Sequence, residues 1–100
     1  MTHVTFLPEA EHEMLEAALY YQSQATRLGV DFLYEVERAA KSIAESPDTW
    51  PILEGELRRR LIKRFPFGIL YRVESGKIVV IAVAHLRRKP GYWKERIQKT

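Results

Sequence analysis

The spacing of apolar residues changes near residue 57, and this change limits the chain to a mixed α and β fold. Up to that point, apolar side chains recur every three or four residues, as they do on one face of a helix. The first such stripe is Met14, Ala17/Ala18, Tyr21 and Ala25, and the second is Phe32/Leu33, Val36, Ala40 and Ile43. Beyond it the helical spacing is lost, and we predict strands over 57–63, 68–74 and 77–85.

The first half of the chain predicts a strand followed by two helices. Residues 4–7 form a short β-prone run that Pro8 stops, and Pro8 suits the first turn of a helix. Gly29 is expected to end this helix in the left-handed conformation, and Asp31 to begin a second helix that ends at Ser46-Pro47. Because the connection is short, we expect an antiparallel helical hairpin.

The second half predicts a small sheet around one buried strand. Residues 78–84 are apolar at every position, which is typical of a central strand covered on both faces. Ser75-Gly76 predicts a tight turn before this strand, and Pro66 belongs to a loop or a strand entry. We therefore predict one α+β domain over 1–100, in the order β-α-α-β-β-β, with a helical hairpin packed on a mainly antiparallel sheet.

The charge of the chain is divided between its two halves. Residues 1–56 carry three Lys and Arg against eleven acids, whereas residues 57–100 carry thirteen Lys and Arg against Glu74 and Glu95. The charges are therefore 3 − 11 = −8 and 13 − 2 = +11, which sum to the net +3. Such a basic block indicates an external anionic partner, a phosphate backbone or an acidic protein segment. The alternative is that the acidic half neutralises the basic half.

Composition argues against several classes of protein. No apolar run reaches the length of about 20 residues that spans a bilayer, and no signal peptide is visible. The chain has no cysteine, and His3, His12 and His85 are widely separated, so we expect neither a metal site nor a cofactor. We expect a cytoplasmic protein that does not bind membranes.

Motifs along most of the chain resemble one family, the RelE/ParE superfamily of bacterial toxins, and more closely its ParE-like, plasmid-stabilisation branch. The resemblance covers roughly 90 of the 100 positions. It is carried by Phe6-Leu7-Pro8-Glu9-Ala10-Glu11, Ala18-x-Tyr20-Tyr21, Leu28-Gly29-x-x-Phe32-x-x-Glu35-Val36, Ser46-Pro47-x-x-Trp50-Pro51, Arg59-Arg60-x-x-x-x-Arg64-Phe65-Pro66-Phe67-x-Ile69-x-Tyr71 and Ala82-Val83-x-His85-x-Arg87-Arg88-x-Pro90-x-Tyr92-Trp93.

The resemblance implies the toxin of a type II toxin–antitoxin module, held in a hetero-oligomer by its cognate antitoxin. Characterised ParE-like toxins poison DNA gyrase and are not enzymes, whereas RelE-like toxins cleave messenger RNA on the ribosome. The basic residue of RelE-like toxins falls here on Gly68 or Phe67, which carry no charge. We therefore expect inhibition of growth through gyrase without catalysis. Ribosome-dependent cleavage is the alternative, and a binding module that has lost toxicity is a third.

Candidate site residues come from the basic half. For target binding we predict Arg59, Arg64, Arg87, Arg88 and Tyr92, and for contact with the acidic antitoxin Arg58, Arg60, Arg87 and Arg88. If the protein is a nuclease, the catalytic candidates are His85, Arg87 and Tyr92.

Further expectations concern packing. In a strand, Arg58 and Arg60 share one face and Arg59 the other. We expect Trp93 to pack on the helical hairpin, Glu35 and Glu37 to face solvent, and residues 86–99 to be little constrained by the core.

Overall fold

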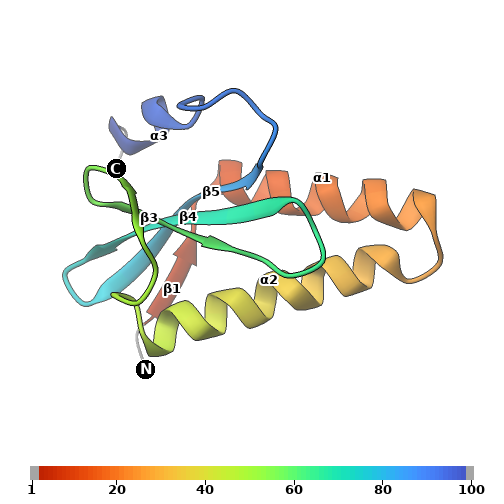
Figure 1. The fold of residues 1–100 in the computed structure, drawn as a ribbon, viewed down its shortest axis with the longest axis horizontal. Coiled ribbons are helices and arrows are strands. Elements are labelled where there is room, and N and C mark those ends of the chain that lie inside the picture. Colours follow the sequence, from red (N-terminus) through yellow and green to blue (C-terminus); the bar gives the residue numbers. More distant parts are fainter. Residues whose placement is uncertain (1–2, 99–100) are drawn as a thin grey trace.

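The computed structural model describes residues 3–98 as a five-stranded sheet with a helical hairpin (Figure 1). The elements are β1 (His3–Phe6), α1 (Pro8–Gln24), α2 (Leu28–Glu45), β2 (Ile52–Glu54), β3 (Leu57–Leu61), β4 (Phe67–Glu74), β5 (Lys77–His85) and α3 (Lys94–Gln98). The predicted α+β class and the order β-α-α-β-β-β are confirmed. The structure adds β2 and α3, which are too short to show a strand or helix period.

The sheet is built around β5, as its apolar run predicts. The strand order is β1-β5-β4-β3-β2, with β1 parallel to β5 and every other pair antiparallel. Ser75 and Gly76 both have positive φ, 40° and 78°, in the tight turn between β4 and β5. Two positive φ values match the right-handed twist of a hairpin, so this turn fixes the register of the two longest strands.

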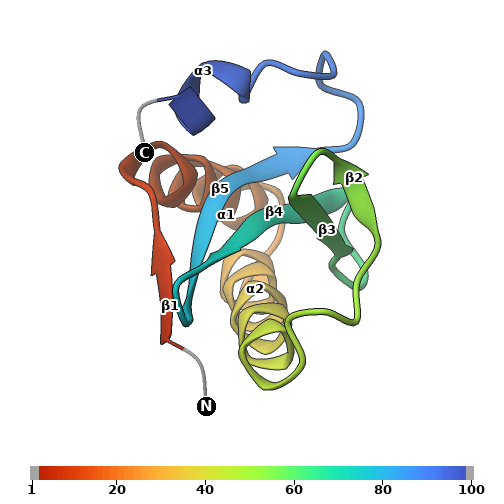
Figure 2. The same cartoon turned by 90° about the vertical axis from the view of Figure 1, so that its left-hand side faces the viewer.

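Figure 2 shows α2 and α3 on opposite sides of the sheet. Each face of the sheet has its own apolar layer. On the face covered by α1 and α2, the rings of Tyr21, Phe32, Phe65 and Phe67 form a cluster with centroids 4.8–6.2 Å apart. The other face carries a smaller cluster that includes Leu57, Leu70, Val79, Ile81, Ala82, Ala84 and Trp93. A register shift between Leu70 and Tyr71 lets neighbouring residues Ile81 and Ala82 belong to the same layer.

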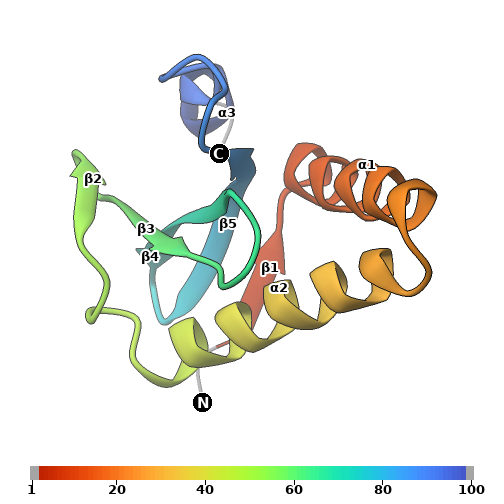
Figure 3. The same ribbon diagram turned by 45° about the vertical axis from the view of Figure 1, so that its right-hand side comes forward.

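The helices lie antiparallel and side by side on the sheet, as expected, but their connection is not the one predicted (Figure 3). Arg27, with φ 69°, takes the left-handed conformation, and Gly29 lies inside the first turn of α2. Gly29 is needed there because a Cβ would lie 2.4 Å from the Ala18 carbonyl oxygen of α1. The side chain of Gln22 accepts from the Gly29 N–H at 3.0 Å, which satisfies one free donor of the new helix.

The inner face of α2 differs in two positions from the expected stripe. Ala39 is buried where Ala40 was expected, and Glu35 is buried at 8% exposure although it was expected to face solvent. The Glu35 carboxylate accepts from Arg38 Nη1 at 3.2 Å. An ion pair one turn along the helix therefore reduces the cost of burying this charge. Glu37 is exposed, as expected.

Candidate functional site

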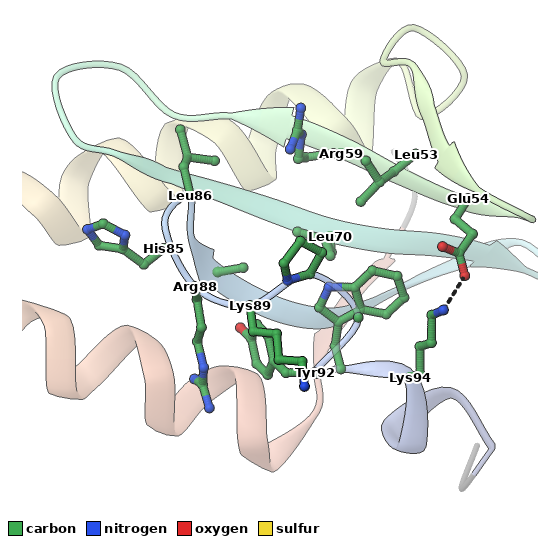
Figure 4. Close-up of a pocket in the computed structure, with 14 residues that line it drawn as sticks. Leu53, Glu54, Arg59, Leu70, His85, Leu86, Arg88, Lys89, Tyr92 and Lys94 are labelled. Carbon is green, nitrogen blue, oxygen red and sulfur yellow. Dashed lines mark ion pairs between the residues drawn. The ribbon is translucent and has the colours of Figure 1, made fainter.

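A pocket of about 300 Å³ opens between the free face of the sheet and the segment that follows β5 (Figure 4). Its apolar part comes from Leu53, Leu70, Ala84, Pro90 and Trp93. Its polar rim comes from Glu54, Arg59, His85, Arg88, Lys89, Tyr92 and Lys94. The pocket therefore combines four of the basic side chains of the second half with a hydrophobic interior.

One wall of the pocket is held in place by Glu13 of α1, a residue that is not among the predicted site residues. Its carboxylate is 10% exposed and accepts from Tyr92 Oη at 2.6 Å and from Arg88 Nη1 at 3.2 Å. Arg96 donates to both carboxylate oxygens, at 2.8 and 3.1 Å. Such a two-point guanidinium–carboxylate contact is among the stronger polar interactions in proteins. Glu13 therefore joins α1 to the C-terminal segment.

Glu13 and Arg96 also bind backbone groups of β5 beyond the point where its pairing with β1 ends. The parallel pairing of these strands ends at Phe6 and Val80. Further along β5, the N–H of Val83 donates to Glu13 Oε1 at 3.0 Å, and the carbonyl of Ile81 accepts from Arg96 Nη1 at 3.2 Å. Two side chains thus replace the backbone partners that a longer β1 would supply.

Tyr92 is enclosed by charged groups. Arg88 lies over its ring at 3.7 Å and Arg96 lies 5.0 Å from the ring centroid. Burial, followed by the hydrogen bond to Glu13, raises the pKa of the Tyr92 hydroxyl well above its ordinary value. Burial acts to lower the pKa of Arg96, but the hydrogen bond and the charge of Glu13 outweigh it and raise that pKa.

Trp93 packs on the sheet and not on the helical hairpin, which corrects the expectation from the sequence. Its side chain is 5% exposed and belongs to the apolar layer of the free face, with Leu57, Leu70 and Ile81. Tyr21 and Phe32 of the hairpin already pack with Phe65 and Phe67 on the other face, so the Trp93 ring closes the layer that α1 and α2 do not cover. Residues 86–98 are therefore tied to the core, contrary to the expectation of a loosely constrained end.

The consecutive arginines of β3 divide between the two faces, as predicted. Arg58 donates to the carbonyls of Asp48 and Trp50, and Arg60 donates to Ser42 Oγ at 2.7 Å and lies over the Trp50 ring. Burial, and then the charge of Arg38, lowers the pKa of Arg60. Arg59 lies on the opposite face and lines the pocket.

The candidate catalytic residues lie near one another without forming a reactive group. His85 Nδ1 accepts from the backbone N–H of Arg87 at 3.0 Å, and its ring contacts Phe67 edge to face. The Tyr92 hydroxyl is bonded to Glu13, on the α1 side of the segment. Arg64, also predicted for target binding, pairs with Asp31 of α2 at 3.4 Å.

Two further features concern ligands and membranes. Within residues 3–98, the structure holds no cluster of three or more His, Cys, Asp or Glu side chains that could bind a metal ion. Over the same residues, no helix combines the length and apolarity needed to cross a bilayer.

Comparison with known proteins defines first the fold and then the family. The chain superimposes on a solved structure of the chromosomal ParDE TA system from P. aeruginosa with a TM-score of 0.77, covering 87% of this chain and 98% of that one. The identity is 13%, so this similarity concerns the fold. No curated protein matches the chain.

The family follows from the sequence itself. Residues 4–90 match the model of the ParE toxin of the type II toxin–antitoxin system, parDE. The chain belongs to this family, as the motifs in its sequence indicate.

Proposed function

We propose that this protein is the toxin of a type II toxin–antitoxin module, that it inhibits growth by blocking DNA gyrase, and that a cognate antitoxin neutralises it. Membership of the ParE toxin family carries the proposal. The target-binding surface is the pocket and its basic rim, where Arg59, Arg88 and Tyr92 lie close to the segment that carries Arg87. Cytoplasmic action on gyrase remains a prediction.

The antitoxin is expected to cover the helical hairpin. Several large apolar side chains of α1 and α2 are exposed, including Leu19 at 72%, and the others are Leu15, Tyr20, Val30 and Tyr34. Exposed apolar side chains on two neighbouring helices suit the apolar face of a segment that folds on binding. Its acids would pair with Arg87, and Arg88 would join them only by exchanging its bond to Glu13. Arg58 and Arg60 were also predicted for this contact, but each already donates to groups of its own chain, so their contribution would require these bonds to exchange.

Ribosome-dependent cleavage of messenger RNA is less well supported. Gly68 lacks the basic side chain of RelE-like toxins, and the stem of Arg59 lies across it, since a Cβ on Gly68 would be 3.1 Å from Arg59 Cγ. The Tyr92 hydroxyl is bonded to Glu13 and its raised pKa makes ionisation harder. A site for RNA cleavage needs an available base and an available acid.

Two assays with the purified protein separate the proposals. Supercoiling of relaxed plasmid by purified gyrase should fall as the toxin is added and recover when the product of a neighbouring antitoxin reading frame is added. Primer extension on a translated message should reveal no new ends. Codon-specific cuts that disappear in His85→Ala or Arg87→Ala, with supercoiling intact, would instead establish the nuclease. If the protein neither reduces supercoiling nor cuts the message, and does not inhibit growth, it is a module that only binds its antitoxin.

A further inference from the structure

The ion pairs of the structure divide the basic half into two groups. Most of its cations are bonded within the chain: Arg58 with Asp48, Arg64 with Asp31, Arg72 with Glu74, Arg88 and Arg96 with Glu13, Lys94 with Glu54, and Arg60 with Ser42. Among residues 57–98, the side chains of five cations have no such partner: Arg59, Lys63, Lys77, Arg87 and Lys89. Neutralisation of the basic half by the acidic half therefore holds only for the five cations of the first group that pair with Asp31, Asp48, Glu54 or Glu13.

We call four of these five cations the free cation group: Arg59, which lines the pocket from the middle of β3, and Lys63, Arg87 and Lys89, which lie in loops at one end of the sheet. Lys63 lies in the loop between β3 and β4, and Arg87 and Lys89 follow β5. The two segments are in contact, because the N–H of Leu86 donates to the carbonyl of Pro66 at 2.9 Å. Lys77 begins β5 and therefore lies at the opposite end of that strand.

Apolar surface adjoins two members of the free cation group, Arg59 and Lys89, at the pocket. Leu61 and Leu86 are 48% and 47% exposed, and Leu86 lines the pocket together with Arg59 and Lys89. The interior of the pocket is apolar, with Leu53, Leu70 and Trp93 among its lining. A ligand that fits must place anionic groups on the rim and a large apolar group in the pocket.

We propose that this surface binds an acidic peptide segment of the target protein, in which carboxylates flank a large apolar side chain. That the segment belongs to the target protein rests on the proposed function. That the segment is acidic with an apolar side chain rests on the free cation group and the pocket. A nucleic acid fits less well, because single-strand binding relies on aromatic rings that stack with bases. Here Arg88 covers the Tyr92 ring at 3.7 Å and Trp93 is buried.

Fluorescence anisotropy with a labelled synthetic peptide tests the proposal. The probe carries acidic residues on both sides of a Leu-Phe pair, and a second peptide has Ser-Ser in its place. Lys89→Glu should weaken binding of the first peptide by about tenfold or more, since it replaces attraction by repulsion at the rim. Lys77→Glu is the matched control: it makes the same change on an exposed lysine without an ion pair, and it should alter binding less than about twofold. Ser-Ser should weaken binding by about tenfold, through the lost apolar contact.

Three results would overturn the proposal. They are equal effects of Lys89→Glu and Lys77→Glu, equal affinity for the Ser-Ser peptide, and tighter binding of a random-sequence DNA duplex than of the Leu-Phe peptide. Thermal melts confirm that both variants fold. The gyrase assay on the same samples separates the two proposals: peptide binding without gyrase inhibition contradicts the proposed function alone, and gyrase inhibition without peptide binding contradicts this inference alone.

Discussion

At the scale of single residues, the Glu13 carboxylate organises the site. It receives donors from β5, from the loop after β5 and from α3, so three consecutive segments that are far from α1 in sequence are held by one side chain. The carboxylate is mostly buried, and its charge is balanced by Arg88 and Arg96. An acid that is buried, saturated with donors and placed beside the pocket has a structural role that its neighbours on α1 lack.

We predict that Glu13→Gln lowers the free energy of unfolding by roughly 3 kcal/mol, because the half-buried Arg96 loses its counter-charge. Chemical denaturation measures the loss. Glu16→Gln is the matched control one turn further along α1, where the carboxylate is 68% exposed and pairs only with His12. Its effect should stay below about 0.5 kcal/mol. Equal effects of the two substitutions would contradict the role assigned to Glu13.

At the scale of elements, the helical hairpin depends on close approach of α1 and α2 at Gly29. Ala in place of Gly in a helix ordinarily stabilises by about 1 kcal/mol. Here the added Cβ would meet the Ala18 carbonyl at 2.4 Å, and backbone cannot move aside as a side chain can. We predict that Gly29→Ala lowers stability by about 1–3 kcal/mol in spite of the helix preference. A variant as stable as the parent would show that the helices can separate at little cost.

The C-terminal segment is a second element whose position depends on one anchor. Trp93→Ala should cost roughly 3 kcal/mol or more, because the ring fills the apolar layer of the free face. Thermal and denaturant melts measure the cost, and gyrase inhibition should fall with it. Intrinsic fluorescence provides an independent check, since Trp50 is the only other tryptophan and a Trp50→Phe background isolates the Trp93 signal. A solvent-like emission of Trp93 in the folded protein would contradict its burial.

At the scale of the whole molecule, the two halves neutralise each other in part and leave one basic region free. Asp31, Asp48, Glu54 and Glu13 of the acidic half pair with cations of the basic half. The pairing is selective, since the free cation group has no acid partner among residues 3–98. Cations that are not paired within the chain are available to bind a partner.

We predict that the double variant Arg87→Glu/Lys89→Glu abolishes growth inhibition with a change in stability of less than about 0.5 kcal/mol, because both side chains are exposed. Arg88→Glu should differ, since it removes the ion pair with Glu13 and the contact with the Tyr92 ring, and it should lower stability as well. Induced expression in bacteria measures growth inhibition, and thermal melts measure stability. Full toxicity of the double variant would place the active surface elsewhere, around residues 58–64.

The sequence by itself determined the elements whose causes are local. The helical periods, the apolar run of β5, the Ser75-Gly76 turn and the end of α2 before Ser46-Pro47 all follow from neighbouring residues. The motifs were also sufficient to predict the family that the comparison found.

Tertiary structure decided what depends on residues far apart in sequence. Gly29 looks like a helix end until α1 is seen to cross it, and Glu13 looks like an ordinary acid of α1 until Arg96 reaches it from the other end of the chain. Glu35 is buried on α2, where its charge also acts on Arg60 of β3. Trp93 packs on the free face because α1 and α2 already cover the other. Which cations remain unpaired likewise depends on the distances between side chains, and these distances cannot be read from the order of residues in the chain.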